Sequence, residues 1–289
     1  MNTDSTTNTD STNTNPTRID KVALCFIVSY ECGKLLKEKI WEEWIAENSD
    51  IINVYVHYRD KSILSPFLRE HIIPEEFVFK TTYYHMVPAY MTTLAHAYVH
   101  DISNKWFCIL TESCIPVLSP TKFREHFEMN KKKSIMKWTP ATWNVDMHKR
   151  ANLHRFAPKF HVWNEPWMTL SRLHVSACMH FINVRPDIYQ LVCLGGLANE
   201  SMFALILFDV DEISHIADEN KHNLLNTSCS IQDWDRMDGP THPYTFTSAS
   251  DMEYIISKKN ECPHAMFARK ISDTFPDSCV YAICGMTEK

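Results

Sequence analysis

The sequence WFCILTESCIPVL at residues 106–118 decides the fold. Its first five residues are apolar without alternation, a pattern typical of a strand that is buried on both faces of a parallel sheet. Thr111, Glu112 and Ser113 follow directly, and Pro116 lacks a backbone N–H, so we expect the strand to end before or near it. Because open α/β sheets bind ligands at the carboxyl ends of their central strands, we expect a ligand site beside Glu112 and Ser113.

A strand, a helix and a second strand are predicted ahead of this stretch. Residues 21–30 (KVALCFIVSY) and 51–57 (IINVYVH) are apolar runs, and residues 34–48 between them carry apolar side chains at helical spacing. Such a βαβ unit is right-handed and builds a parallel sheet. Three candidate ligand contacts stand at the carboxyl ends of these two strands: Ser29, Tyr30 and His57.

The rest of the chain alternates between the two patterns, which indicates an α/β fold. We expect short strands at residues 77–81, 167–170 and 231–234, and helices at residues 88–100, 121–129, 171–181 and 251–258, with another helix that opens at residue 198. Residues 131–167 mix basic residues with tryptophans and have poor periodicity. This region is either a long functional loop over a pocket or a solvated basic face with buried tryptophans.

Length and composition restrict the class of protein. The 289 residues are 45% hydrophobic and carry a net charge of −6, so the chain can bury a core and has no general attraction for nucleic acid. No apolar stretch reaches the roughly 18 residues of a membrane span. Residues 1–18 are rich in Asn, Thr and Ser, and we expect a disordered tail before a single domain at residues 19–289. The sequence gives no indication of the oligomeric state.

Cysteine and glycine usage exclude several kinds of chemistry. Ten cysteines without a secretion signal indicate free thiols and a cytoplasmic location, which would be the host cytoplasm or the virion if the chain is viral. None of the cysteines forms a Cys-x-x-Cys pair, so a zinc site is disfavoured. The five glycines include no dinucleotide-binding or Walker spacing and no nucleophile elbow. Pattern alone therefore predicts an α/β domain with a site at the sheet end but does not identify its ligand.

Six blocks of sequence, in order, resemble the core 2/I-branching β1,6-N-acetylglucosaminyltransferase family (glycosyltransferase family 14), and most closely its plant-type members. The blocks are INVYVH at 52–57, NKWFCILTESCIPVL at 104–118, WNEPWMTLSR at 163–172, ANESM at 198–202, QDW at 232–234 with HPYTF at 242–246, and MFARK at 266–270. The resemblance spans residues 21–272. It implies a GT-A type fold, with a central, mostly parallel sheet flanked by helices, and inverting transfer of a sugar from a UDP-sugar to a glycan hydroxyl.

The resemblance implies specific roles for two charged residues. A carboxylate must deprotonate the acceptor hydroxyl, and the Asp-Glu motif of the family places this general base at Glu200. Asn199 stands where that motif has Asp. The family uses basic side chains instead of a metal to neutralise the leaving diphosphate, and Lys270 matches this role, with Arg269 as a neighbour that could assist. The alternatives are a glutamate favoured by a helix N-terminus and a solvated basic turn.

Aromatic residues are the candidates for acceptor binding. Trp234 matches the acceptor-side tryptophan of the family, and the alternative is a tryptophan of the hydrophobic core. Trp163 and Trp167 belong to the third block, and with Asn199 they complete the candidate acceptor set. Ser29, Tyr30, His57, Glu112 and Ser113 join Lys270 and Arg269 as the candidate donor set.

Two other functions stay open at this point. One is a non-catalytic glycan-binding or assembly protein on the same fold. The other is a metal-dependent transferase that uses Asp209 and Asp211, an Asp-x-Asp pair that follows the Glu200 segment. The resemblance favours N-acetylglucosamine as the transferred sugar and implies no metal or other cofactor, although relatives also use UDP-xylose or UDP-glucuronic acid.

Overall fold

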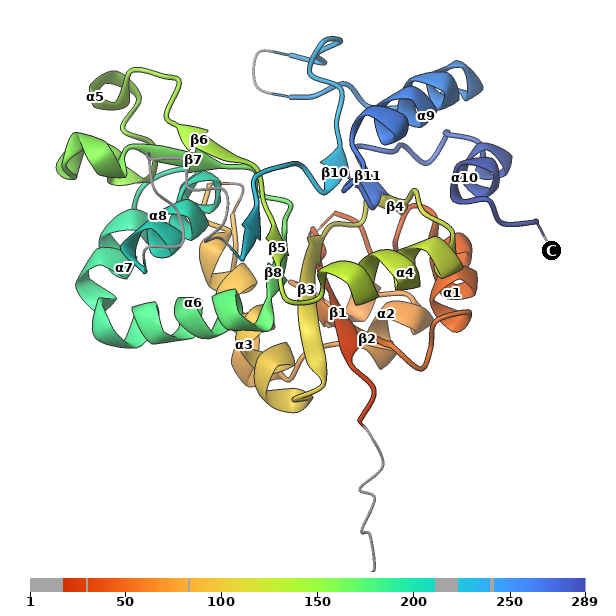
Figure 1. Cartoon of the computed structure of the whole chain (residues 1–289), viewed down its shortest axis with the longest axis horizontal. Coiled ribbons are helices and arrows are strands. Elements are labelled where there is room, and N and C mark those ends of the chain that lie inside the picture. The colour runs from red at the N-terminus through yellow and green to blue at the C-terminus, as the bar shows by residue number, and fades with distance from the viewer. Residues whose placement is uncertain (1–17, 30, 83, 211–222, 240–241, 289) are drawn as a thin grey trace, which may run out of the picture.

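The computed structural model describes residues 18–29, 31–82, 84–210, 223–239 and 242–288. Its largest sheet has the strand order β2-β1-β3-β8-β5-β9 (Figure 1). The strands are β1 (Lys21–Ile27), β2 (Ile52–His57), β3 (Asn104–Leu110), β5 (Ser134–Ile135), β8 (Thr169–Ser171) and β9 (Leu224–Leu225). β1 is parallel to both β2 and β3, β5 is parallel to β9, and β8 is antiparallel to β3 and β5. The sheet is therefore mixed, with the expected parallel unit at its centre.

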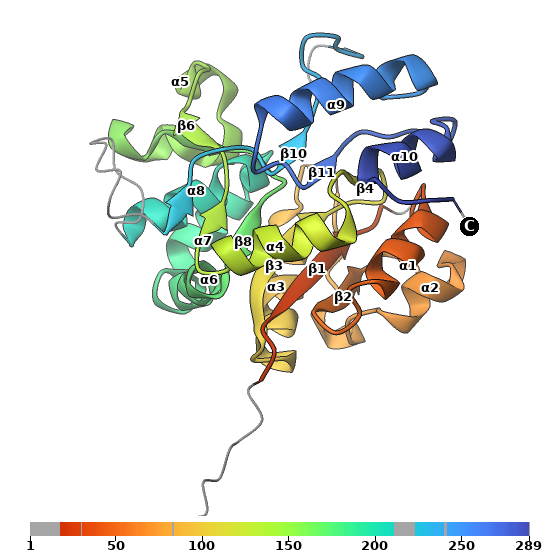
Figure 2. The same ribbon diagram turned by 45° about the vertical axis from the view of Figure 1, so that its right-hand side comes forward.

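Both faces of this sheet are covered by helices, as Figures 1 and 2 show. Alternate residues of β1 and β3 pack into two separate hydrophobic clusters, because successive side chains of a strand point to opposite faces. Residues 106–110 are each at most 1% exposed, which confirms a strand buried on both faces. One face packs against α3 (Val87–His100), α6 (Arg172–Val184) and α8 (Met202–Asp209), and the other against α1 (Glu38–Ala46), α2 (Pro66–Glu70) and α4 (Pro120–Asn130).

A second, small sheet joins the last part of the chain to the central strand. It has the order β10-β11-β4 and consists of β4 (Ile115–Pro116), β10 (Ser230–Ile231) and β11 (Phe267–Ala268). β11 is antiparallel to β4 and parallel to β10. Its side chains pack with α9 (Met252–Glu261) and α10 (Asp277–Cys284) in a third hydrophobic cluster. This sheet brings the MFARK block beside the residues that follow β3.

The basic and aromatic region at residues 131–167 is a series of short elements. They are β5, the hairpin strands β6 (Trp138–Pro140) and β7 (Val162–Asn164), helix α5 (Val145–His148), and 3₁₀ turns at Arg150–Arg155 and Pro158–Phe160. Helix α7 (Pro186–Cys193) packs against the first of these turns. All four tryptophans of this region are partly buried, and Trp138, Trp143 and Trp167 pack against the core, so both alternatives for the region stay open.

Several predicted elements differ from the structure. The first helix begins at Glu38 rather than residue 34, because the Leu35 amide donates to the Glu38 carboxylate and the Leu36 amide donates to the Glu112 carbonyl. Residues 77–81 form no strand, since the Phe79 amide donates to a histidine side chain instead of a neighbouring strand. Helices α7 and α10 were not predicted, and β8 lies two residues later than expected.

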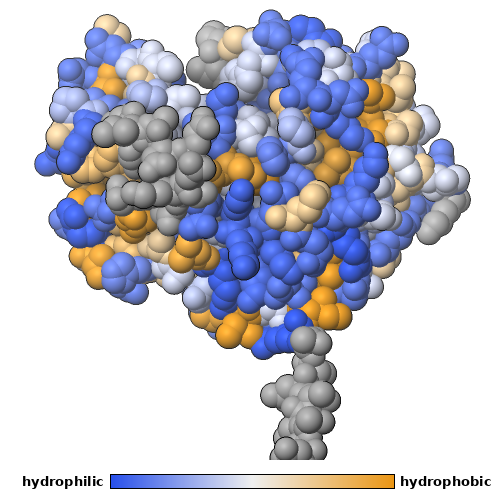
Figure 3. Space-filling view, in the orientation of Figure 1, coloured by the Kyte–Doolittle hydropathy of each residue, from blue (hydrophilic) through white to orange (hydrophobic). Residues whose placement is uncertain are grey.

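The outer surface is mixed in character. The face in Figure 3 is mostly hydrophilic over α4, and its hydrophobic residues lie in scattered patches. Among the helices of the described ranges, none combines the length and the hydropathy that a bilayer crossing requires.

Candidate active site

The carboxyl end of β3 brings candidate donor residues together. The Ser29 amide donates to Glu112 Oε2 over 3.4 Å, and the Ile271 amide donates to the Ser113 carbonyl over 2.9 Å. The second hydrogen bond fixes Lys270 beside the strand end. Burial lowers the pKa of Lys270 and so does the neighbouring Arg269, while the negative charges of Asp238 and Glu112 act in the opposite direction. A half-buried cation therefore lies at the place where the sequence predicts donor phosphates.

Two residues predicted for this end are not part of the group. Tyr30 lies outside the described residues. His57 is 1% exposed, and its Nε2 accepts the Phe79 N–H over 3.2 Å. Burial lowers the pKa of His57 to about 4, so the ring is neutral at physiological pH. Donor binding by His57 stays a prediction, and its buried, occupied ring does not favour direct contact.

Glu200 ends the 3₁₀ turn Ala198–Glu200, just before α8. Arg150 Nη1 lies 3.3 Å from Glu200 Oε2, and the two side chains are 31% and 24% exposed. The pKa of Glu200 is raised by burial, and the charge of Arg150 and the indole of Trp163 oppose this shift. A carboxylate with a raised pKa that still reaches solvent is suited to act as a general base near neutral pH.

Arg269 and a buried tyrosine, Tyr90, connect the two parts of the candidate site electrostatically. The Arg269 guanidinium lies over the Trp167 ring with its Cζ 4.2 Å from the centroid, and Arg269 Nη1 donates to Gln232 Oε1 over 3.1 Å. Burial raises the pKa of the Tyr90 hydroxyl. The positive charge of Arg269 opposes this rise, and the negative charge of Glu200 adds to it. Arg269 is only 7% exposed, so this part of the block is not a solvated basic turn.

The side chain of Asn164 holds the Glu200 turn in place. Asn199 is 7% exposed, and its carbonyl accepts a hydrogen bond from Asn164 Nδ2 over 2.9 Å. Asn164 Oδ1 also accepts the Ala204 N–H over 3.1 Å, so one side chain joins β7, the turn and α8. Glu200 is therefore carried on a fixed turn, which is what a positioned base requires.

A second carboxyl group is buried near Arg269. Ser228 Oγ donates to Glu165 Oε1 over 2.8 Å. Burial raises the pKa of Glu165 to about 7, although the charges of Lys137 and Arg269 act to lower it. Glu165 and Glu200 thus differ: the first is deeply buried, whereas the second reaches solvent and contacts a cation.

The candidate acceptor tryptophans and the candidate metal-binding aspartates differ in where they lie. Trp234 is 49% exposed, so it is not a tryptophan of the core, and Trp163 lies against the Glu200 carboxylate. Asp209 ends α8, where its Oδ1 lies 3.9 Å from Nη1 of Arg185, and Asp211 is not among the described residues. Within the described ranges, no group of three or more His, Cys, Asp or Glu side chains is arranged to hold a metal ion.

Sequence reasoning missed Arg150, Tyr90, Asn164 and Glu165. Arg150 stands in the basic region for which a loop over a pocket was one of two alternatives, but nothing in its local pattern distinguishes it from the other basic residues there. Asn164 and Glu165 lie inside the WNEPWM block and could have been singled out from it. Tyr90 occurs on an ordinary helical stripe and carries no signal of its own.

The mixed sheet, with its parallel centre and helices on both faces, has the arrangement of a GT-A type α/β fold. A model of the Core-2/I-Branching enzyme family matches residues 24–256, most of the sequence, and the chain belongs to this family. It is therefore an enzyme that uses a nucleotide sugar and a glycan acceptor.

Other comparisons add little. The 4-diphosphocytidyl-2C-methyl-D-erythritol synthase from Anaerococcus prevotii has a similar structure with a TM-score of 0.32 and 11% sequence identity, over 66% of this chain and 96% of that one. This similarity is too low to support an argument. No curated protein sequence matches the chain.

Proposed function

We propose that the chain is an inverting, metal-independent glycosyltransferase that transfers N-acetylglucosamine from its UDP-sugar to a glycan hydroxyl. One observation carries the proposal: the charges of Glu200 and of Arg269 both act on the buried hydroxyl of Tyr90, and Lys270 follows Arg269 directly in the chain. A base and a phosphate-binding cation on either side of a common space are what a single displacement requires.

Each group has a defined part in this reaction. Glu200 takes the proton of the acceptor hydroxyl while the oxygen of that hydroxyl forms a bond to the anomeric carbon of the donor sugar. The bond from that carbon to the β-phosphate oxygen breaks, its electron pair leaves with UDP, and the configuration inverts. Lys270 stabilises the negative charge that develops on the diphosphate, with Arg269 behind it. Exposed Trp234 offers an aromatic face to the acceptor sugar.

The same geometry supports the metal-free form of the reaction. Lys270 supplies positive charge at the end of β3, where Glu112 is held by the Ser29 amide. The alternative metal pair has its described member, Asp209, beside Arg185 at the far end of α8. Addition of EDTA and of Mn²⁺ tests this point, because stimulation by Mn²⁺ with loss of activity in EDTA would favour the metal-dependent alternative.

The decisive experiment compares two substitutions with a matched control. Glu200→Gln should lower the transfer rate by about 10²–10⁴-fold, the usual contribution of a general base, while UDP binding by calorimetry stays nearly intact. Lys270→Ala should weaken UDP binding by roughly tenfold, since it removes a charged hydrogen-bond donor. Glu47→Gln, an exposed change on the surface beyond α1, should alter neither quantity.

Two outcomes would contradict the proposal. If no UDP-sugar raises the melting temperature, the chain does not bind the donor class proposed here. If Glu200→Gln transfers sugar as fast as the unchanged protein, another group is the base.

A further inference from the structure

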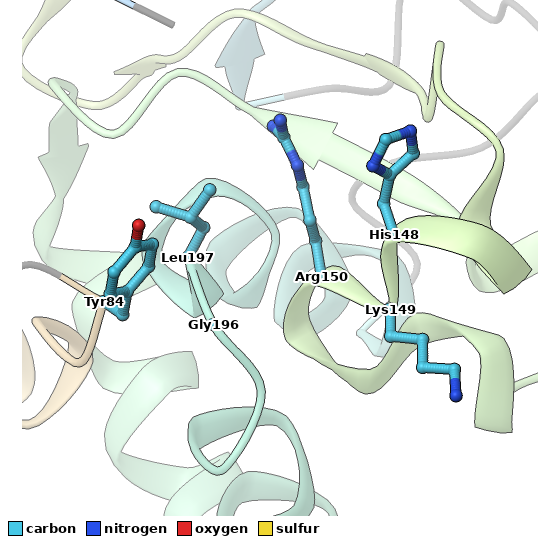
Figure 4. Close-up of a pocket in the computed structure, with 6 residues that line it drawn as sticks. All are labelled: Tyr84, His148, Lys149, Arg150, Gly196 and Leu197. Atoms are coloured by element: carbon cyan, nitrogen blue, oxygen red, sulfur yellow. The ribbon is translucent and has the colours of Figure 1, made fainter.

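A cavity of about 190 Å³ opens beside the proposed base. It is lined by Tyr84, His148, Lys149, Arg150, Gly196 and Leu197. In Figure 4, His148 at the end of α5 and Arg150 at the start of the following 3₁₀ turn extend in the same direction, Lys149 turns the opposite way, and Tyr84 and Leu197 lie across from them. The cavity does not include the residues at the end of β3, so it is separate from the proposed donor site.

The walls of this cavity are held together by backbone contacts. The Ala151 amide donates to the Gly196 carbonyl over 2.9 Å, and the Leu197 amide donates to the Tyr84 carbonyl over 3.1 Å. Ala151 and Leu197 both have positive φ, 51° and 57°, a conformation that residues other than glycine rarely adopt. Such strained positions cluster at functional sites, because the surrounding structure must hold them. The cavity is therefore built into the fold.

The charge and shape of the lining indicate the class of ligand. No lining residue is acidic, and Arg150 supplies a guanidinium with several N–H donors. Tyr84 is 56% exposed and offers a flat ring face to a sugar. A cation beside an exposed aromatic ring suits a saccharide unit that carries a negative group.

Arg150 connects the cavity to the chemistry. It contacts Glu200 over 3.3 Å and lines the cavity as well, with its Cζ 5.0 Å from the Trp143 ring centroid. An ion pair that is partly exposed contributes only about 0–1 kcal/mol, so an incoming anion can take a share of the guanidinium at little cost. The charge of Arg150 lowers the pKa of Glu200, and an anion that shares this charge therefore leaves Glu200 a stronger base.

We propose that the acceptor is an acidic saccharide, with a carboxylate or sulfate group that Arg150 binds while Tyr84 supports the sugar ring. This inference rests on the proposed function, because it places the acceptor next to Glu200. The shared chemistry is an anionic group on a sugar, and its two sources are a uronic acid and a sulfate ester.

The test compares three acceptor oligosaccharides that differ at one unit: a neutral hexose, the matching uronic acid, and the same hexose with a sulfate ester. With UDP-N-acetylglucosamine as donor, kcat/KM for one or both acidic acceptors should exceed that for the neutral one by about tenfold, the effect of one charge-assisted contact. The better acidic acceptor identifies the source of the negative group.

Two variants and a control locate the effect. Arg150→Gln should bring the ratio of acidic to neutral kcat/KM close to one. Gly196→Ala should also reduce it, because its methyl group would lie 3.7 Å from the Tyr84 ring and narrow the cavity without a clash. Lys132→Gln removes the same charge from an exposed position beside α4 and should leave the ratio unchanged.

The possible results separate this inference from the function on which it rests. Equal or better use of the neutral acceptor, with transfer that still depends on Glu200, overturns the acidic acceptor and leaves the glycosyltransferase intact. Where turnover is slow, binding of the three acceptors to Glu200→Gln, measured by saturation-transfer NMR, gives the same ratio, and a ratio of one overturns the inference. Absence of donor binding instead overturns the proposed function itself.

Discussion

Gly195 and Gly196 are neighbours in sequence, yet a methyl group should be tolerated at only one of them. A Cβ atom at Gly195 would lie 2.4 Å from the Asn152 nitrogen and 2.5 Å from the Ala151 carbonyl carbon. Both are backbone atoms, so they cannot rotate away, and the two loops would have to separate by about 1 Å to restore ordinary contact. At Gly196 the nearest atom is in the Tyr84 ring at 3.7 Å, which is ordinary contact already.

The cost of Gly195→Ala follows from these distances. Overpacking costs about 1–3 kcal/mol, and loss of the hydrogen bond from the Ala151 amide to the Gly196 carbonyl would add about 1 kcal/mol. A total of about 2–4 kcal/mol should lower the melting temperature by about 4–8 °C for a protein of this size. Gly196→Ala should stay within about 2 °C of the unchanged protein, since Gly→Ala at a compatible site is neutral or slightly stabilising.

Thermal unfolding followed by circular dichroism measures both variants under the same conditions. The transfer rate of Gly195→Ala should fall as well, because the displaced segment leads directly into the turn that carries Glu200. Equal melting temperatures for the two variants would refute the reasoning, since the close approach of the two loops would then not exist in solution.

Three further predictions follow from the site. Glu165→Gln should stabilise the protein by about 2–4 kcal/mol at pH 8 and have little effect at pH 5, as measured by urea unfolding. The pKa of Glu165 in the folded protein, about 7, lies above the ordinary 4.5. Ionisation of Glu165 therefore lowers the free energy of unfolding of the unchanged protein as the pH rises from 4.5 to 7. Trp167→Leu should weaken UDP binding about fivefold in calorimetry through loss of the ring under Arg269, and Trp167→Phe should weaken it less; equal affinities would contradict a role for this contact. The transfer rate should fall as the pH falls through the raised pKa of Glu200. Arg150→Gln should move this acidic limb of the pH–rate profile to higher pH, because Arg150 lowers the pKa of Glu200. An acidic limb that does not move would show that Glu200 is not the titrating group.

The central part of the fold follows from sequence, because its signal is strong and local. Residues 106–110 are apolar without interruption, and the two runs before them frame an amphipathic helix, so the parallel unit β1-α1-β2-β3 was predictable. The direction of β8 was not, because three residues carry no orientation signal and the pairing with β3 is a tertiary contact. The start of α1 depends on the Glu112 carbonyl, which is distant in sequence.

The candidate site, like the fold, could be predicted from the sequence only in part. Glu200 and Lys270 could be selected from motif matches, yet their environment could not be predicted. Arg150 contacts Glu200 from a turn whose neighbouring residues have positive φ, and Tyr90, on an ordinary helical stripe, lies close enough to both Arg269 and Glu200 to feel their charges. Ring contacts and electrostatic neighbours arise from three-dimensional packing between distant segments, and no spacing rule along one segment contains them.

The pairing of β4 with β11 makes the candidate site depend on two segments that are distant in the sequence. The large sheet and its covering helices come from segments before residue 226, whereas Lys270, the cation proposed to bind the leaving group, follows β11. The same late segment is tied back to the first helix, because Lys37 Nζ donates to the Asp273 carbonyl, 236 positions away. A chain interrupted between these strands would lack Lys270, and it would also lose Met266 and Phe267 from the hydrophobic cluster that covers one face of the large sheet. The proposed catalysis and the packing of this face thus both depend on contact between segments that are far apart in the sequence.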